Sequence, residues 1–150
     1  MTDKSIARPI SKLFPAIAIL IALVGLSDAV YLTIHHYTAE PVPCSIVEGC
    51  EMVLTSAYAL IGGVPLAAIG AAAYLAAIIL AAITLTGRNL AWKLYGLQVT
   101  IMTIVTCWLI YLQGFVIGAF CQFCLLSAAI TFTLFIIFII SKVIKRSAIR

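Results

Sequence analysis

The chain has 150 residues, of which 65% are hydrophobic and only 9% are charged, and its mean hydropathy is +1.23. Because a soluble domain usually carries about 25% charged residues, this chain has too little polar surface to cover a globule in water. The composition predicts a membrane protein and excludes a soluble cytoplasmic enzyme, a nucleic-acid-binding protein and a disordered tail. The net charge of +4 is therefore interpreted as a signal of membrane topology first, and only then as a sign of an acidic partner.

Four apolar stretches are long enough to cross a bilayer, since a helix needs about 20 residues to span a core of ~30 Å. They cover approximately residues 13–34, 64–86, 94–115 and 120–141. None shows the alternation of a barrel strand, and helices satisfy their backbone hydrogen bonds internally. The sequence predicts an all-α membrane protein, a four-transmembrane-helix bundle that forms a single domain over residues 1–150.

The basic residues predict how this bundle is oriented. They precede the first span, separate the second from the third, and follow the fourth: Lys4, Arg8, Lys12, Arg88, Lys93, Lys142, Lys145, Arg146 and Arg150. The first outer loop holds Glu40, Glu48 and Glu51 and no Lys or Arg. Because basic segments stay in the cytoplasm, both termini are expected inside and both odd-numbered loops outside a cell (cytoplasmic) membrane.

The first outer loop carries two cysteines. Cys44 follows two prolines, which cannot continue a helix, so its thiol is expected on an exposed, mobile segment. Cys50 leads into the amphipathic stretch 51–60, which predicts a short interfacial helix ended by the glycine pair 62–63. One mobile and one docked thiol are typical of a pair that shuttles electrons by disulfide exchange. A static disulfide that staples the loop is the alternative.

Cys121 and Cys124 open the fourth span at the same outer edge, whereas Cys107 lies inside the third span. At a helix start, free backbone N–H groups stabilise a thiolate, and the Cys-x-x-Cys spacing lowers the thiol pKa further. This pattern predicts a redox pair, with a structural disulfide or a chance pair of small residues as the alternative. Cys107 is expected to be a buried small apolar side chain.

Several short runs in this sequence match one known family. They are Cys44 and Cys50, the Gly49-Cys50 step that leads into 54–59, the segment 63–67 with Gly70 and Tyr74 beyond it, and Cys-Gln-Phe-Cys at 121–124. On these residues the sequence resembles the vitamin K epoxide reductase family in its compact bacterial or archaeal form, over nearly the whole chain. DsbB-type quinone-linked oxidases have the two cysteine pairs in the opposite order.

The resemblance implies a bundle that holds a quinone near the outer leaflet. Electrons would pass from a thioredoxin-fold protein to the outer cysteine pair, then to the inner pair, then to the quinone ring. By position, Cys124 would meet the quinone and Cys121 would exchange with Cys50. Cys44 would form the mixed disulfide with the partner, and Ser56 would match the Ser or Thr that the family has near its active site.

The resemblance also implies a partner and an acceptor. Many bacterial members carry a fused thioredoxin-like domain after a fifth span, and this chain has neither, so we expect a separate thioredoxin-fold (DsbA-like) protein. The Asn and Tyr that animal members place near the quinone are replaced by the stretches 66–67 and 127–128. Ubiquinone or menaquinone is therefore the expected acceptor. The function expected is disulfide formation in exported proteins at the outer face of the membrane.

An apolar quinone suits a pocket between helices that is lined by small and aromatic residues. The residues expected to line it are Ser56, Gly63, Leu66, Gly70, Tyr74, Phe123 and Ser127. Close helix packing explains the small ones equally well. Asp28, the one Asp, Glu, Lys or Arg side chain inside a predicted span, and His35 are candidates for a proton relay, with interfacial solvation as the alternative.

Two other classes of protein stay open at this point. A small four-span transporter would need a carboxylate deep in the bundle, and Asp28 is predicted near the outer third of its span. A thiol-based metal-binding membrane protein would use the cysteines as ligands. The wide spacing and outward location of Cys44 and Cys50 argue against a four-cysteine zinc site, and no bound metal is expected.

Overall fold

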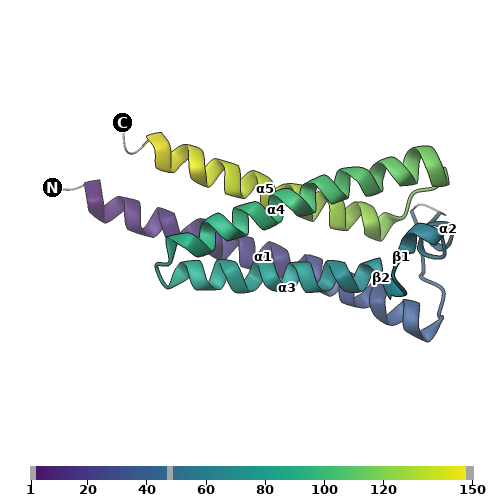
Figure 1. Ribbon diagram of the computed structural model, residues 1–150. Helices are drawn as coiled ribbons and strands as arrows, with labels where there is room; N and C mark the ends of the chain where they lie inside the picture. The colour runs from purple at the N-terminus through teal and green to yellow at the C-terminus, as the bar shows by residue number, and fades with distance from the viewer. Residues whose placement is uncertain (1–2, 47–48, 148–150) are drawn as a thin grey trace.

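A computed structural model of the protein describes residues 3–46 and 49–147. Its long helices are α1 (Asp3–Thr38), α3 (Leu66–Leu85), α4 (Asn89–Tyr111) and α5 (Gln122–Ser147). α1 and α4 each pack against both α3 and α5, which makes an elongated bundle (Figure 1). The described helices include four segments long and apolar enough to cross a membrane: Lys12–Thr38, Leu66–Leu85, Asn89–Ile117 and Gln122–Ser147. The predicted four-helix membrane bundle is confirmed.

Three of these helices are longer than the predicted spans. α1 continues to Thr38 instead of ending near residue 34, α4 begins at Asn89 instead of near residue 94, and α5 reaches Ser147 instead of ending near residue 141. The predicted limits were placed at polar or charged residues. Those limits are too short because such residues keep helical geometry at the membrane surface, where long basic side chains extend into water.

The loop between α1 and α3 contains a short helix, as predicted, but that helix is shorter than expected. α2 spans Cys50–Leu54 and is followed by a 3₁₀ turn, η1 (Ala57–Ala59), and by a hairpin of β1 (Leu60–Ile61) and β2 (Val64–Pro65). Gly62 and Gly63 adopt φ angles of 59° and 84°, the left-handed values that a two-residue hairpin turn needs. The prediction of a helix over 51–60 is therefore wrong beyond Leu54.

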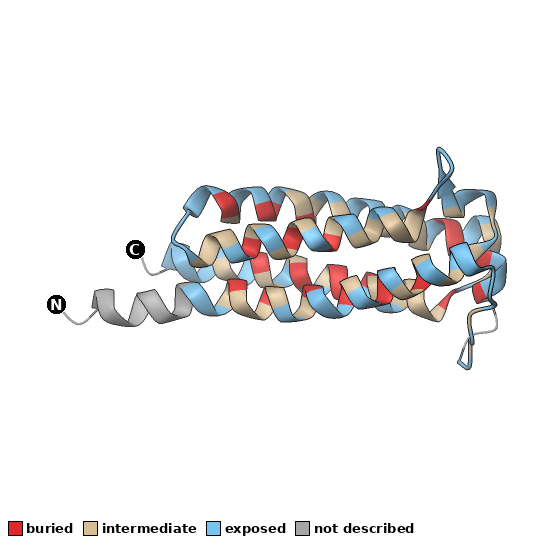
Figure 2. Cartoon of the chain, turned by 90° about the horizontal axis from the view of Figure 1, so that it is seen from below, coloured by how far each residue is buried: buried red, intermediate tan, exposed pale blue. Residues whose placement is uncertain are grey.

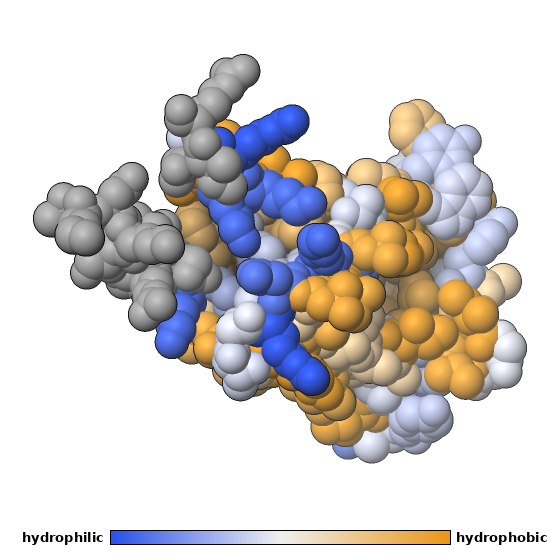
Figure 3. Space-filling view, turned by 60° about the vertical axis from the view of Figure 1, so that its left-hand side comes forward, coloured by the Kyte–Doolittle hydropathy of each residue, from blue (hydrophilic) through white to orange (hydrophobic). Residues whose placement is uncertain are grey.

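The two ends of the bundle differ in charge. The chain termini and the α3–α4 connection lie at one end, and α2 lies at the other (Figure 1). Hydrophilic side chains gather over the end with the termini (Figure 3), where the sequence has Arg88 before α4 and Lys145 and Arg146 in the last turn of α5. The side chains of Lys4 and Arg8, and residues Glu48 and Arg150, lie outside the described part of the chain. Basic residues that the sequence assigns to the cytoplasmic side thus lie at one end of the bundle, and the side of the membrane that this end faces stays a prediction.

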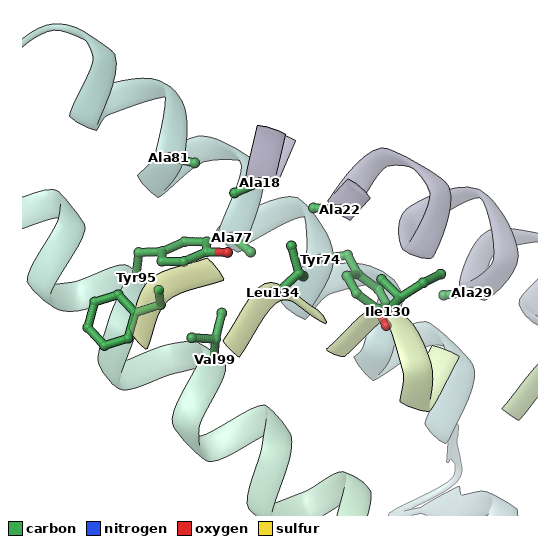
Figure 4. Packing of buried hydrophobic residues seen from close by; sticks show 11 residues of the cluster. Ala18, Ala22, Ala29, Tyr74, Ala77, Ala81, Tyr95, Val99, Ile130 and Leu134 are labelled. Atoms are coloured by element: carbon green, nitrogen blue, oxygen red, sulfur yellow. The ribbon is translucent and has the colours of Figure 1, made fainter. Parts of the chain in front are cut away.

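Small side chains let the helices approach closely in the core. Ala18 and Ala22 of α1 and Ala77 and Ala81 of α3 are fully buried, and small residues at such contacts permit close backbone packing. Larger buried side chains from α4 and α5 complete the cluster (Figure 4). Buried residues follow the interior of the bundle and exposed residues its outside (Figure 2), which leaves large apolar side chains facing outward as lipid requires.

Candidate functional site

Four of the five cysteines lie together at the end of the bundle that carries α2. Cys44 and Cys50 form a disulfide, with their Cα atoms 6.2 Å apart. Cys50 and Cys121 are fully buried in one cluster with Val53, and Cys44 and Cys124 pack against this cluster. Cys121 and Cys124 are free thiols. The fold thus places an oxidised pair directly beside a reduced pair.

The turn between α4 and α5 fixes the position of Cys121. The predicted spans leave residues 116–119 as the connection, but the helix continues as a π-helical segment, η2 (Leu112–Ile117), and Gly118 then reverses the chain with a φ of 69°. The backbone carbonyl of Gln113 accepts the Ala119 N–H (3.1 Å), and its side-chain Oε1 accepts the Cys121 N–H (3.0 Å). One buried glutamine therefore holds the segment that leads into the Cys-x-x-Cys run.

Cys121 lies at the N-terminus of α5, where its sulfur is hydrogen-bonded. Its Sγ accepts the backbone N–H of Cys124 at 3.4 Å. Hydrogen bonding from the Cys124 side chain is the largest effect on Cys121 and, against the opposing effect of burial, lowers the pKa of its thiol to about 7. A thiolate is the form that attacks disulfides, so Cys121 is primed for exchange with its neighbour Cys50 near neutral pH.

This pKa predicts that the Cys121 thiolate builds up in the neutral range. In a Cys107→Ala variant whose outer disulfide is intact, the ultraviolet absorbance of thiolate should rise with a midpoint near pH 7, because deprotonation follows the lowered pKa. The Cys121→Ser variant should lack this transition. A midpoint in the ordinary thiol range of about 8.5 would show that the hydrogen bonds from Cys124 do not stabilise the Cys121 thiolate.

Two contacts hold the outer pair over the inner pair. A Cβ atom built on Gly49 would lie 2.7 Å from the Phe120 carbonyl oxygen and 2.9 Å from the Ala119 Cβ, so the two backbones meet with no room for a side chain. Gln122, inside the Cys-x-x-Cys run, accepts the Ile46 N–H at its Oε1 (3.1 Å) and donates from Nε2 to the Pro43 carbonyl (3.5 Å). The loop around Cys44 is therefore anchored to the start of α5.

Cys124 borders a cavity of about 570 Å³ between the helices. Five of the seven residues predicted to bind a quinone line this cavity: Ser56, Leu66, Gly70, Tyr74 and Ser127. The Tyr74 hydroxyl donates to the Ser127 carbonyl (2.9 Å), and lies 2.9 Å from Ser127 Oγ and 3.0 Å from Thr131 Oγ1. The inner cysteine pair thus has one buried member facing Cys50 and one member facing a large, mainly apolar cavity.

A comparison with protein families matches residues 16–139 to the vitamin K epoxide reductase family. The chain belongs to that family. Membership of the vitamin K epoxide reductase family indicates a multi-pass membrane thiol oxidoreductase, and a cysteine disulfide beside two free thiols fits this class of enzyme. Family membership therefore favours redox chemistry at the cysteines over the transporter and metal-binding alternatives.

In this member of the vitamin K epoxide reductase family, a carboxyl group of α1 faces the same cavity. Asp28 is 8% exposed, and its Oδ2 atom is buried with no hydrogen-bond partner among the described residues. His35 also lines the cavity, and its Nδ1 lies 3.2 Å from the Glu40 carbonyl oxygen. Both residues proposed for a proton relay are therefore in reach of the cavity, one deep and one near its outer end.

Other predicted residues lie elsewhere. Gly63 is in the hairpin turn, and the Phe123 ring is tilted against that of Tyr31 with ring centroids 5.3 Å apart; neither residue lines the cavity. The prediction that Cys107 is buried is wrong, because its side of α4 faces outward and the thiol is exposed. Within the described chain, no group of three or more His, Cys, Asp and Glu residues is placed to hold a metal ion.

Gln113 and Gln122 are the polar residues that sequence analysis missed as parts of this site. Gln113 had a usable signal, because a polar amide in an apolar span needs a partner inside the protein. Gln122 had no such signal in the sequence beyond its place between two cysteines. Its contacts join segments 76 and 79 residues apart, and such pairing depends on how distant loops meet.

Proposed function

We propose that the protein is a quinone-linked thiol oxidoreductase that supports disulfide formation in exported proteins. Electrons pass from a separate thioredoxin-fold (DsbA-like) protein to Cys44 and Cys50, then to Cys121 and Cys124, and finally to ubiquinone or menaquinone. The observation that carries this proposal is the position of Cys124, which belongs to the pair beside the Cys44–Cys50 disulfide and also borders the cavity.

Each transfer in this sequence is a balanced two-electron exchange. The partner's dithiol is oxidised to a disulfide as the Cys44–Cys50 disulfide is reduced. The resulting outer dithiol then reduces a disulfide between Cys121 and Cys124 and becomes a disulfide again. That state corresponds to the arrangement described above, with the outer pair oxidised and the inner pair reduced. Oxidation of the inner dithiol releases two electrons and two protons, which convert a quinone to its hydroquinone.

The residues around the cavity suit a quinone. Its lining is mostly aliphatic, as an apolar ring needs, and a few polar groups face it from separate helices. The buried Oδ2 of Asp28 lacks a partner within the described chain, and a buried polar atom without a hydrogen bond calls for an explanation, which a role in proton transfer at the cavity supplies. We assign Asp28, with His35 toward the outer end, to holding protons released by the inner thiols.

The proposed orientation puts the cysteine end outside the cell membrane. Disulfides persist in oxidising compartments and are rare in the cytosol, and the basic end of the bundle would stay in the cytoplasm. Cys44 is the more accessible member of its pair, since it is partly exposed whereas Cys50 is fully buried. Cys44 is therefore the residue that a thioredoxin-fold partner would attack.

Quinone reduction with two different electron donors tests this function. The purified protein should reduce a short-chain quinone when supplied with either a reduced thioredoxin-fold carrier or dithiothreitol. Cys44→Ala should lower the carrier-driven rate by roughly a hundredfold or more, because the mixed disulfide cannot form, yet spare the reduction driven by dithiothreitol. Equal activity of Cys44→Ala with both donors would count against the relay. A wild-type protein that reduces no quinone with either donor would remove the proposed function itself.

A further inference from the structure

Gln113 presents an unused hydrogen-bond donor to the cavity. The residue is 4% exposed, lies in the π-helical segment η2 and lines the cavity beside Cys124. The Cys121 N–H is a donor, so the amide atom that it contacts must be the oxygen. This assignment turns Nε2 away from Cys121, and Nε2 makes no hydrogen bond to any described residue. This donor opens onto the cavity, so a ligand that supplies an acceptor there would satisfy it.

The Gln113 donor differs from the other polar groups of the cavity in its position and in its hydrogen bonding. The Tyr74 hydroxyl already donates to Ser127, and Asp28 lies on α1, whereas Gln113 lies in η2, the segment that continues α4. The residues that flank Gln113 on the cavity wall are apolar, among them Leu109 and Ile117. A quinone offers two carbonyl acceptors and an apolar ring. The Gln113 amide N–H suits one of these carbonyl oxygens, and the aliphatic side chains around it suit the apolar ring.

We propose that Gln113 binds the quinone by donating a hydrogen bond from Nε2 to one of its carbonyl oxygens. This inference rests on the proposed function and names the residue that orients the ring. The same side chain fixes the Cys121 N–H through Oε1, so one amide joins the quinone to the backbone of the cysteine pair. Gln113 thereby sets the ring's orientation relative to Cys124.

The Gln113→Glu variant separates the two roles of the amide. Its carboxyl keeps an oxygen for the Cys121 N–H, but when ionised it has no proton to donate. Binding of a short-chain ubiquinone and of a short-chain menaquinone to the full-length protein in detergent should weaken roughly tenfold at high pH. Binding should recover as the carboxyl is protonated at low pH, whereas wild-type affinity should not follow this pH change. Gln113→Met should bind weakly at every pH.

The infrared spectrum of the bound quinone gives a second readout, which a purely structural role would not move. A hydrogen-bonded carbonyl absorbs at lower frequency, so the carbonyl band of an isotope-labelled quinone should move toward its unbound position in both Gln113 variants. Gln98→Met is the matched control. Gln98 is on the same helix, but its Nε2 donates to the Ala73 carbonyl (2.6 Å) and it does not line the cavity. Affinity and carbonyl band should stay at wild-type values in Gln98→Met.

The outcomes separate this inference from the function on which it rests. Wild-type protein that neither binds nor reduces either quinone would remove the proposed function. Wild-type protein that binds and reduces quinone, together with unchanged affinity and an unchanged carbonyl band in Gln113→Glu, would overturn the role of Gln113 alone. An equal loss of affinity in Gln98→Met would also overturn it, because the effect would then come from helix packing. Should Gln113→Met not fold, the pH series of Gln113→Glu still decides.

Discussion

Replacing Cys124 with alanine is expected to lower quinone reduction by roughly a thousandfold or more, whichever thiol donor is supplied. Cys124 is the member of the inner pair that borders the cavity, whereas Cys121 is fully buried against Cys50 and does not line it. A two-electron transfer from a dithiol needs both sulfurs, because one forms the disulfide with the other. The variant should therefore keep its fold but lose the last transfer.

The Cys124→Ala variant should also accumulate a trapped species. Without its resolving partner, Cys121 can exchange only with Cys50: its thiolate attacks the Cys44–Cys50 disulfide at Cys50 and releases the Cys44 thiol. A Cys50–Cys121 disulfide should therefore form without an added dithiol and be detectable by non-reducing mass spectrometry. Cys107→Ala is the control, since the Cys107 thiol is exposed on α4 and lies outside the cysteine cluster and the cavity lining. Unchanged quinone reduction in Cys124→Ala, with Cys107→Ala also active, would contradict the assignment of Cys124.

The fold was predictable because it depends on summed properties of long segments. Hydropathy over about 20 residues identifies a span even when single positions deviate, and the basic residues fix its orientation relative to the others. The ends of helices depend on local detail instead. The pair Gly62 and Gly63 was interpreted as a helix end and in fact closes a hairpin, because glycines in left-handed conformation serve both purposes.

The cysteines of the site were predictable and much of their surroundings was not. The spacing of Cys121 and Cys124 at a helix start carries its own chemistry, so no knowledge of distant contacts is needed. The burial of Cys107 was mispredicted because a span that is apolar on all sides gives no sign of which face meets lipid. The cavity lining likewise depends on how the helices rotate against one another, which places Phe123 outside it and Gln113 inside it.

Replacing Gly49 with alanine is expected to slow transfer between the two cysteine pairs by roughly a hundredfold, the cost of misplacing reacting groups by about 1 Å. Gly49 has φ −93° and ψ 5°, values that any residue can adopt, so its backbone conformation does not require glycine. Space does. The added Cβ would lie 2.7 Å from the Phe120 carbonyl oxygen, and a backbone atom cannot rotate away as the tip of a side chain can. The segment that carries Cys50 would have to move away from Cys121.

Rapid mixing with dithiothreitol, followed by alkylation and mass spectrometry, would measure how fast each pair becomes reduced in Gly49→Ala. The outer pair should be reduced at the wild-type rate, because its disulfide stays accessible at Cys44, whereas electrons should reach an oxidised inner pair slowly. Ser45→Val adds more bulk to the same loop at an exposed position and should transfer normally. Wild-type transfer in Gly49→Ala would mean that the loop approaches Cys121 by another route, and that the packing of Gly49 on Ala119 and Phe120 does not align the two pairs.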